Sequence, residues 1–208
     1  MTRTSNSRER TCLVTVGATV GFPALTNVVL EPAFWSVLQK RGFTSLRLQC
    51  GPDIESASQK VSLHSADLPK GFRVDVFERR KNLMKEEMVL CKEAPGQKQG
   101  LIISHAGTGS ILDAWKVGVP LIVVPNAALL DNHQAEMAAH VAKEGYATAS
   151  KPELNALQGA IEKVEILAQR SQSRWPANSV NVAGSASSLW SLAPDEVTKE
   201  QNAQMAHD

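Results

Sequence analysis

The chain has 208 residues, of which 43% are hydrophobic and 21% are charged. This length suits one domain with a tail, and the hydrophobic fraction is too high for a mainly disordered chain. Lys and Arg number 22, Asp and Glu number 21, and the formal net charge is +1. A net charge this close to zero excludes a strongly basic protein, whose overall charge would attract it to nucleic acid. No nucleic-acid partner is therefore expected.

The cysteines are odd in number and contain no C-x-x-C pair: Cys12, Cys50 and Cys91. We expect reduced, largely buried thiols and a cytosolic environment. No close group of Cys and His has zinc-site spacing, so neither a metal nor another cofactor is expected. The early uncharged run is broken by glycine and proline, and no apolar run is long enough to span a bilayer, so neither a secretory signal nor a membrane span is expected.

The first part of the chain is predicted to contain three strands and a broken helix. Short apolar or alternating runs indicate strands at residues 11–16, 45–50 and 72–77. Residues 23–41 indicate helix, interrupted before Pro32 because a proline ring disfavours helical backbone at the preceding residue. Residues 1–10 are predicted to be a flexible N-terminus.

The segments around the third strand are rich in polar residues. Residues 51–69 contain many Ser, Asp and Pro and are predicted to be a loop. Residues 79–93 are predicted to form one charged amphipathic helix with Leu83, Met84 and Leu90 on its inner face. Residues 94–100 are predicted to be a second loop.

The later part of the chain continues the alternation of strands and helices. Strands are predicted at 101–103, 120–124 and 147–149, and helices at 111–117 and 133–143. A last helix is indicated by a stripe of apolar residues after a candidate capping box at Ser150 to Glu153; its members are Leu154, Leu157, Ile161, Val164 and Ala168.

This alternation predicts an α/β fold, a Rossmann-like parallel sheet with helices on both faces, over residues 11–170. Residues 171–208 are predicted to be a tail, either disordered or with a short partner-docking helix that includes Leu189 and Trp190. Ligands of such sheets bind at the carboxyl ends of the strands, which directs attention to the loops after Val16, Ile103 and Val124.

A glycine-rich turn follows the strand at 101–103. A helix start offers free N–H groups and a partial positive charge, so Gly107, Thr108, Gly109 and Ser110 suit a phosphate group. A tight strand-to-helix turn with a serine cap is the alternative. The turn is no Walker A loop, and Leu112 stands where a dinucleotide fingerprint has its third glycine.

Two further groups of polar residues accompany that turn. Asp113 suits the hydroxyls of a ribose, or is an acid that stabilises the helix dipole. Asn132, His133 and Gln134 at a loop-to-helix junction suit the hydroxyls of a hexose, or include a helix cap. Together the three groups predict a nucleotide-sugar pocket.

Segments 101–114 (LIISHAGTGSILDA), 120–126 (PLIVVPN) and 131–134 (DNHQ) carry a family resemblance. They resemble the soluble catalytic subunits of the UDP-GlcNAc transferase that adds the second sugar of dolichol-linked oligosaccharides, with a C-terminal-like domain of glycosyltransferase family 28. Segments 14–17, 48–51 and 74–77 also look like this family. More distantly, the chain is similar to the donor half of the bacterial GlcNAc transferase that makes lipid II.

The resemblance implies the donor half of a GT-B enzyme that transfers GlcNAc from UDP-GlcNAc to GlcNAc-diphosphodolichol with inversion. It places the diphosphate at Gly107, Thr108, Gly109 and Ser110, the ribose at Asp113, and the sugar at Asn132, His133 and Gln134; Gly17, Thr19 and Asn126 complete the expected substrate-binding set. His105 is a candidate general base, or it orients the loop while the partner supplies the base.

This sequence departs from the family pattern at three places. The order Gly17-Ala18-Thr19 replaces a Thr directly after the glycine, Asp113 stands where Glu is common, and residues 94–100 look like an insertion.

The resemblance also implies a partner and a location. It implies a membrane-anchored subunit that carries the acceptor half, and a place in the cytoplasm and at the cytosolic face of the endoplasmic reticulum, reached peripherally through that partner. The alternatives from other classes are a non-catalytic nucleotide-sugar-binding regulatory module and a dinucleotide oxidoreductase.

Overall fold

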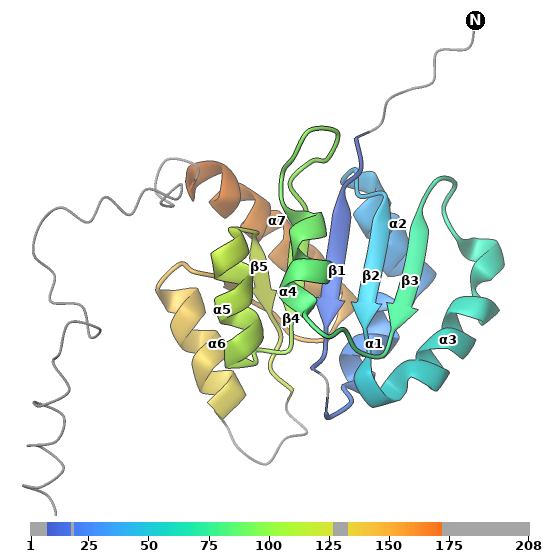
Figure 1. Cartoon of the computed structure of the whole chain (residues 1–208), viewed down its shortest axis with the longest axis horizontal. Coiled ribbons are helices and arrows are strands. Elements are labelled where there is room, and N and C mark those ends of the chain that lie inside the picture. Colours follow the sequence, from blue (N-terminus) through green and yellow to red (C-terminus); the bar gives the residue numbers. More distant parts are fainter. Residues whose placement is uncertain (1–7, 18, 127–132, 172–208) are drawn as a thin grey trace, which may run out of the picture. The chain divides into compact units, whose positions relative to one another are not determined.

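A computed structural model describes residues 8–17, 19–126 and 133–171, and within them six parallel strands form one sheet. The strands are β1 (Thr11–Thr15), β2 (Ser45–Gln49), β3 (Arg73–Phe77), β4 (Leu101–Ser104), β5 (Leu121–Val123) and β6 (Thr148–Ala149). Their order is β3-β2-β1-β4-β5-β6, that of a doubly wound Rossmann sheet (Figure 1). The predicted fold class is confirmed.

Helices cover both faces of the sheet because successive side chains of a strand point to opposite faces. Val14 and Ile103 pack with α1 (Pro23–Val29), α2 (Pro32–Lys40), α3 (Ile54–Leu63) and α7 (Leu154–Ser171). Leu13 and Ile102 pack with the short α4 (Leu83–Glu86), a 3₁₀ turn at Met88–Cys91, α5 (Thr108–Val117) and α6 (His133–Lys143). The two remaining 3₁₀ turns are Gly51–Asp53 and Ser65–Asp67.

The predicted break before Pro32 is confirmed. α1 ends at Val29 and α2 begins at Pro32, and Glu31 between them is extended, with ψ of 140°. The buried state of the thiols is confirmed as well: Cys12, Cys50 and Cys91 are free and buried. Burial raises the pKa of Cys91 to about 12, so this thiol stays protonated and unreactive.

The prediction of a loop over 51–69 was wrong, because α3 occupies most of that segment. Ala57 is the one fully buried residue of α3, and the partly buried Ile54 and Val61 pack beside it, so the apolar stripe has only three members among polar residues. Polar contacts to the preceding helices hold it in place. Lys60 Nζ lies 2.6 Å from Glu31 Oε1 and donates to the carbonyl oxygen of Asn27 at 3.1 Å.

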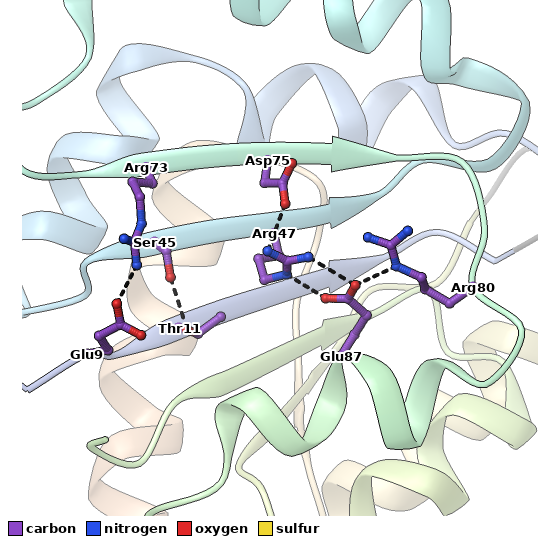
Figure 2. Close-up of polar contacts among 8 residues, drawn as sticks. All are labelled: Glu9, Thr11, Ser45, Arg47, Arg73, Asp75, Arg80 and Glu87. Atoms are coloured by element: carbon purple, nitrogen blue, oxygen red, sulfur yellow. Dashed lines mark hydrogen bonds and ion pairs between the residues drawn. The ribbon is translucent and has the colours of Figure 1, made fainter. Parts of the chain in front are cut away.

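The single helix predicted over 79–93 was also wrong. The segment divides into α4 and the 3₁₀ turn at Glu87, whose side chain turns inward to reach Arg47 and Arg80 (Figure 2). Leu83 and Met84 pack against the core as expected, whereas Leu90 is exposed.

The predicted capping box before the last helix is wrong. The Ser150 hydroxyl donates to the carbonyl oxygen of Lys151, and α7 begins at Leu154. A capping box would need Ser150 to stand directly before the helix. Instead the Glu153 carbonyl accepts the Leu157 N–H at 2.9 Å, so it is Glu153 that stands at the start of the helix, three residues after Ser150.

Candidate functional site

The strand order reverses between β1 and β4, which are neighbours in the sheet. The chain leaves β1 toward α1 on one face and leaves β4 toward α5 on the other. In doubly wound sheets this divergence opens a crevice at the carboxyl ends of the strands, where ligands bind. Gly17 after β1 and His105 after β4 stand at this point.

The His105 imidazole lies between two glycines of the adjoining loops. A Cβ atom on Gly17 would lie 3.1 Å from Nε2, and one on Gly107 would lie 2.4 Å from the same atom. Gly17 also has φ of +92°, a left-handed conformation that side chains disfavour. Both positions therefore need glycine to leave room for the ring, which brings these three predicted site residues together.

The ring is fixed by the end of β1. The His105 backbone N–H donates to the Thr15 carbonyl oxygen at 3.1 Å, and ring Nδ1 lies 3.3 Å from that oxygen. A carbonyl only accepts hydrogen bonds, so Nδ1 carries the proton and Nε2 keeps a lone pair. Desolvation lowers the pKa of His105, partly offset by the bond to Thr15, so the ring is neutral at pH 7.

The start of α5 presents free backbone donors beside this ring. Gly107 is the N-cap residue, and the Ile111 N–H is the first to bond back, to the Gly107 carbonyl at 3.1 Å. The N–H groups of Thr108, Gly109 and Ser110 come before it and therefore have no helical acceptor. No described side chain caps the helix in their place. Thr108 and Gly109 are exposed, which leaves this start open to an anion. The serine-capped alternative is wrong, because Ser110 lies inside the helix.

Asp113 lies in the second turn of α5, and no acid stands in the first turn. The helix dipole acts mainly within the first turn, so a dipole role for this carboxylate is not favoured. Its Oδ1 atom is 3.4 Å from Lys116 Nζ, and both side chains reach solvent.

Asn126 and Gln134 contact each other and link loops of the site. The Asn126 N–H donates to Gln134 Oε1 at 3.0 Å, and Asn126 Nδ2 donates to the Gly21 carbonyl oxygen at 3.3 Å. The buried Asn126 thus ties the loop after β5 to the loop after β1. Thr19 is exposed in the latter loop, Asn132 lies outside the described residues, and His133 is the first residue of α6.

Sequence reasoning missed three polar residues behind the site. Thr15 donates its hydroxyl proton to Gln49 Oε1 at 2.6 Å, and Asp53 Oδ2 accepts the Phe22 N–H at 3.0 Å. In β2 the polar Ser45, Arg47 and Gln49 alternate with Leu46 and Leu48, a pattern that favours a solvent-facing Gln49, yet Gln49 is 4% exposed. A long polar side chain at the last position of a strand, next to a glycine turn, is the signal that could have found it.

A separate hollow of about 560 Å³ lies at the carboxyl ends of β5 and β6, between α6 and α7. Its lining includes Pro125, Ala138, Ser150, Lys151, Gly159 and Lys163, and none of the predicted site residues. Its walls are mainly small apolar side chains. Within the described ranges, no three His, Cys, Asp or Glu side chains gather as a metal site would require. No helix in the same ranges is long and apolar enough to cross a membrane.

The doubly wound sheet and the uncapped helix start at its switch point define a Rossmann-like α/β domain with free backbone donors where ligands of such domains bind. The chain belongs to the glycosyltransferase family 28 C-terminal domain family, whose model matches residues 11–188. This membership argues against the dinucleotide oxidoreductase alternative.

Relatives with established names support this placement. One from Eremothecium gossypii, named UDP-N-acetylglucosamine transferase subunit ALG13, is 31% identical in an alignment of 180 residues that covers 78% of this chain and 85% of that protein. A protein of the same name from Cryptococcus neoformans is 37% identical over 153 residues, covering 65% of this chain and 74% of its own.

Solved structures show the same fold. The NMR solution structure of ALG13 is 28% identical, covers 81% of this chain and 88% of its own, and has a TM-score of 0.55. The crystal structure of Acinetobacter baumannii MurG, at 20% identity and a TM-score of 0.50, matches over 79% of this chain and 41% of its own. At that identity the likeness to MurG concerns the fold alone.

Proposed function

We propose that the chain is the donor-binding subunit of a glycosyltransferase that moves GlcNAc from UDP-GlcNAc to GlcNAc-diphosphodolichol with inversion. The observation that carries the proposal is the uncapped start of α5 at the switch point, next to a neutral His105. The names of the relatives supply the donor and the word subunit.

In the proposed reaction, an acceptor hydroxyl oxygen attacks the anomeric carbon of GlcNAc from the face opposite UDP. The bond from that carbon to the diphosphate oxygen breaks, and UDP leaves with the electron pair. The amides of Thr108, Gly109 and Ser110 stabilise the charge that grows on the diphosphate, a preorganised electrostatic effect that needs no metal. Asp113 binds the ribose, while Asn132, His133 and Gln134 face the sugar.

The acceptor hydroxyl must lose its proton during this displacement. His105 Nε2 has a lone pair and is the candidate proton acceptor at the switch point. A base on the partner subunit is the alternative. Replacing His105 with Gln and recording the pH profile of transfer separates the two. If His105 is the base, the wild-type rate falls at low pH as the ring is protonated, and this fall is absent in the His105→Gln variant.

The acceptor half is proposed to reside on a second, membrane-anchored subunit. This chain would then work at the cytosolic face of the endoplasmic reticulum, held there peripherally by that partner. Support comes from the relatives' names, which call them subunits of a UDP-N-acetylglucosamine transferase.

Reconstitution tests the proposal. The chain is purified with and without its membrane partner, and transfer of labelled GlcNAc from UDP-GlcNAc to a lipid-linked GlcNAc diphosphate is measured. Transfer that needs both components supports the proposal. Donor binding without transfer in any combination would instead favour a regulatory nucleotide-sugar-binding module.

A further inference from the structure

Two buried polar side chains lie side by side at the carboxyl ends of β1 and β2. Thr15 and Gln49 are register partners in the parallel ladder, and their exposed fractions are 0% and 4%. The Thr15 hydroxyl donates to Gln49 Oε1 at 2.6 Å. Burying an amide or a hydroxyl costs free energy unless its hydrogen bonds are made, whereas burying an apolar side chain does not. The presence of this polar pair at the switch point therefore suggests a functional role.

The direction of the Thr15 proton determines what else its oxygen can do. A hydroxyl has one proton, and here it points to Gln49. The lone pairs of Oγ1 are then left to accept, and the Gly17 N–H lies 3.4 Å away in the direction of such a bond. Gln49 thereby sets the hydroxyl so that it supports the left-handed turn at Gly17.

That turn forms one wall of the space that holds His105. A Cβ atom on Gly17 or on Gly107 would have Nε2 as its nearest neighbour, so both glycines border the ring at this atom. The Thr15 carbonyl meanwhile accepts both the backbone N–H and Nδ1–H of His105. Thr15 therefore acts on the imidazole in two ways. Its carbonyl oxygen contacts the ring directly, and its hydroxyl supports Gly17, which also borders the ring.

We propose that Gln49 is a positioning residue of the donor site: by orienting the Thr15 hydroxyl, it holds His105 as the Nδ1–H tautomer with Nε2 facing the crevice. Gln49 itself does not touch the ring. The proposal rests on the proposed function for its catalytic meaning, but the tautomer and the orientation of His105 are properties of the chain alone.

The first test measures the tautomer of His105 directly. Long-range ¹H–¹⁵N correlation spectra of the whole chain report which ring nitrogen carries the proton, and the His105→Gln variant assigns the signal. We expect a single Nδ1–H tautomer in the wild type. Gln49→Met, which keeps the length of the side chain and removes its amide, is expected to give a mixture of tautomers and a His105 pKa closer to its ordinary value.

A matched pair at Thr15 separates the hydroxyl from general packing. Thr15→Val keeps the shape and removes the hydroxyl, whereas Thr15→Ser removes the methyl and keeps the hydroxyl. Thr15→Val is expected to behave like Gln49→Met, and Thr15→Ser like the wild type. Amide spectra establish that each variant is folded; if Gln49→Met fails to fold, Thr15→Val carries the test. An unchanged His105 tautomer and pKa in the folded Thr15→Val variant would overturn the proposal.

The second test measures turnover with the reconstituted enzyme. Gln49→Met is expected to lower kcat about tenfold, with a smaller change in the KM for UDP-GlcNAc, because misplacing a reacting group slows the chemical step more than binding. The double variant with Thr15→Val should lose no more than either single variant, since both act through the same hydroxyl. Multiplying losses would contradict the proposal. A wild-type enzyme without transfer would count against the proposed function alone, because the tautomer measurement still decides the positioning role.

Discussion

The sheet face that carries Leu13 and Ile102 holds two buried polar clusters, which differ in how far their hydrogen bonds are completed. In the first cluster, Glu87 is 2% exposed and is bound by Arg47 at 2.5 and 3.0 Å and by Arg80 at 2.6 Å (Figure 2). Arg47 also pairs with Asp75 at 2.7 Å, and the Arg80 guanidinium lies 4.4 Å from the centre of the Phe77 ring.

The switch point is organised differently. Thr15 and Gln49 satisfy each other, but the amides at the start of α5 have no helical acceptor, and Ser104 Oγ is buried without a hydrogen-bond partner in the described structure. The charge cluster of Arg47, Asp75, Arg80 and Glu87 stabilises the fold, and because its charges are paired with one another it has few free groups for a ligand. An open set of donors contributes little to stability and keeps its binding capacity for an anion. Substitutions in the two regions should therefore separate stability from activity.

The largest effect is expected from opening the charge cluster. Glu87→Gln removes the negative charge that Arg47 and Arg80 share, and we expect a loss of about 3 kcal/mol in the free energy of unfolding, because a buried pair is broken from one side. Urea unfolding measures this loss. Glu55→Gln is the matched control, because the Glu55 side chain of α3 is exposed and makes none of the ion pairs found among the described residues; it should change stability by less than about 0.5 kcal/mol. Equal effects of the two variants would show that Glu87 is not structural.

The next effect concerns the open region. Gly109→Val adds bulk at the helix start, where a Cβ meets nothing within 4 Å, so the fold should tolerate it while the diphosphate is excluded. We expect transfer to fall about 100-fold or more, from loss of both the binding and the amide contacts. Gly159→Val is the control, since that glycine of α7 is equally free of neighbours and lies away from the switch point. Full turnover by the folded Gly109→Val variant would contradict an anion site there.

The charge cluster also predicts how stability depends on pH. Burial opposes ionisation of Glu87, but its hydrogen bonds with Arg47 and Arg80 prevail and lower its pKa below the ordinary value of 4.5. A lowered pKa in the folded state means that the contribution is fully present above pH 4.5 and is lost as pH falls through the folded-state value. Unfolding midpoints of the wild type should therefore decline in acid more steeply than those of Glu87→Gln. Parallel curves would disprove this linkage.

The smallest effect is expected at Asp113. This carboxylate is partly exposed and pairs loosely with Lys116, so its contact with a ribose contributes about 1 kcal/mol. Asp113→Ala should raise the KM for UDP-GlcNAc about fivefold and leave kcat nearly unchanged. Asp113→Glu, with the longer side chain usual in the family, should bind the donor at least as well as the wild type. An unchanged KM in Asp113→Ala would remove this residue from the site.

The sequence predicted the sheet because its strands are short apolar runs bounded by glycine and proline. It also predicted the glycine-rich start of α5, where residue type and position between strand and helix agree. It did not predict α3, because the three core-facing residues of this helix are outnumbered by polar ones and its Lys60 contacts reach residues far back in the chain. Nor did it predict the inward turn of Glu87, because an acid among charged neighbours usually faces water.

The same limit explains why part of the site was missed. Gln49 stands on the polar side of an alternating strand, and only the covering of that side of the sheet buries it. Asn126 stays predicted to bind substrate, but the contacts of its backbone N–H with Gln134 and of its side-chain Nδ2 with Gly21 were not predicted. Contacts between loops far apart in the chain depend on the completed fold, which local pattern does not encode.

An amide titration with UDP-GlcNAc tests the central claim most directly. With ¹⁵N-labelled chain, we predict that the largest and earliest shift changes fall on Gly17 and on Gly107 to Ser110, at the switch point between β1 and β4. Shift changes confined to the hollow between α6 and α7, with the start of α5 unaffected, would contradict the account.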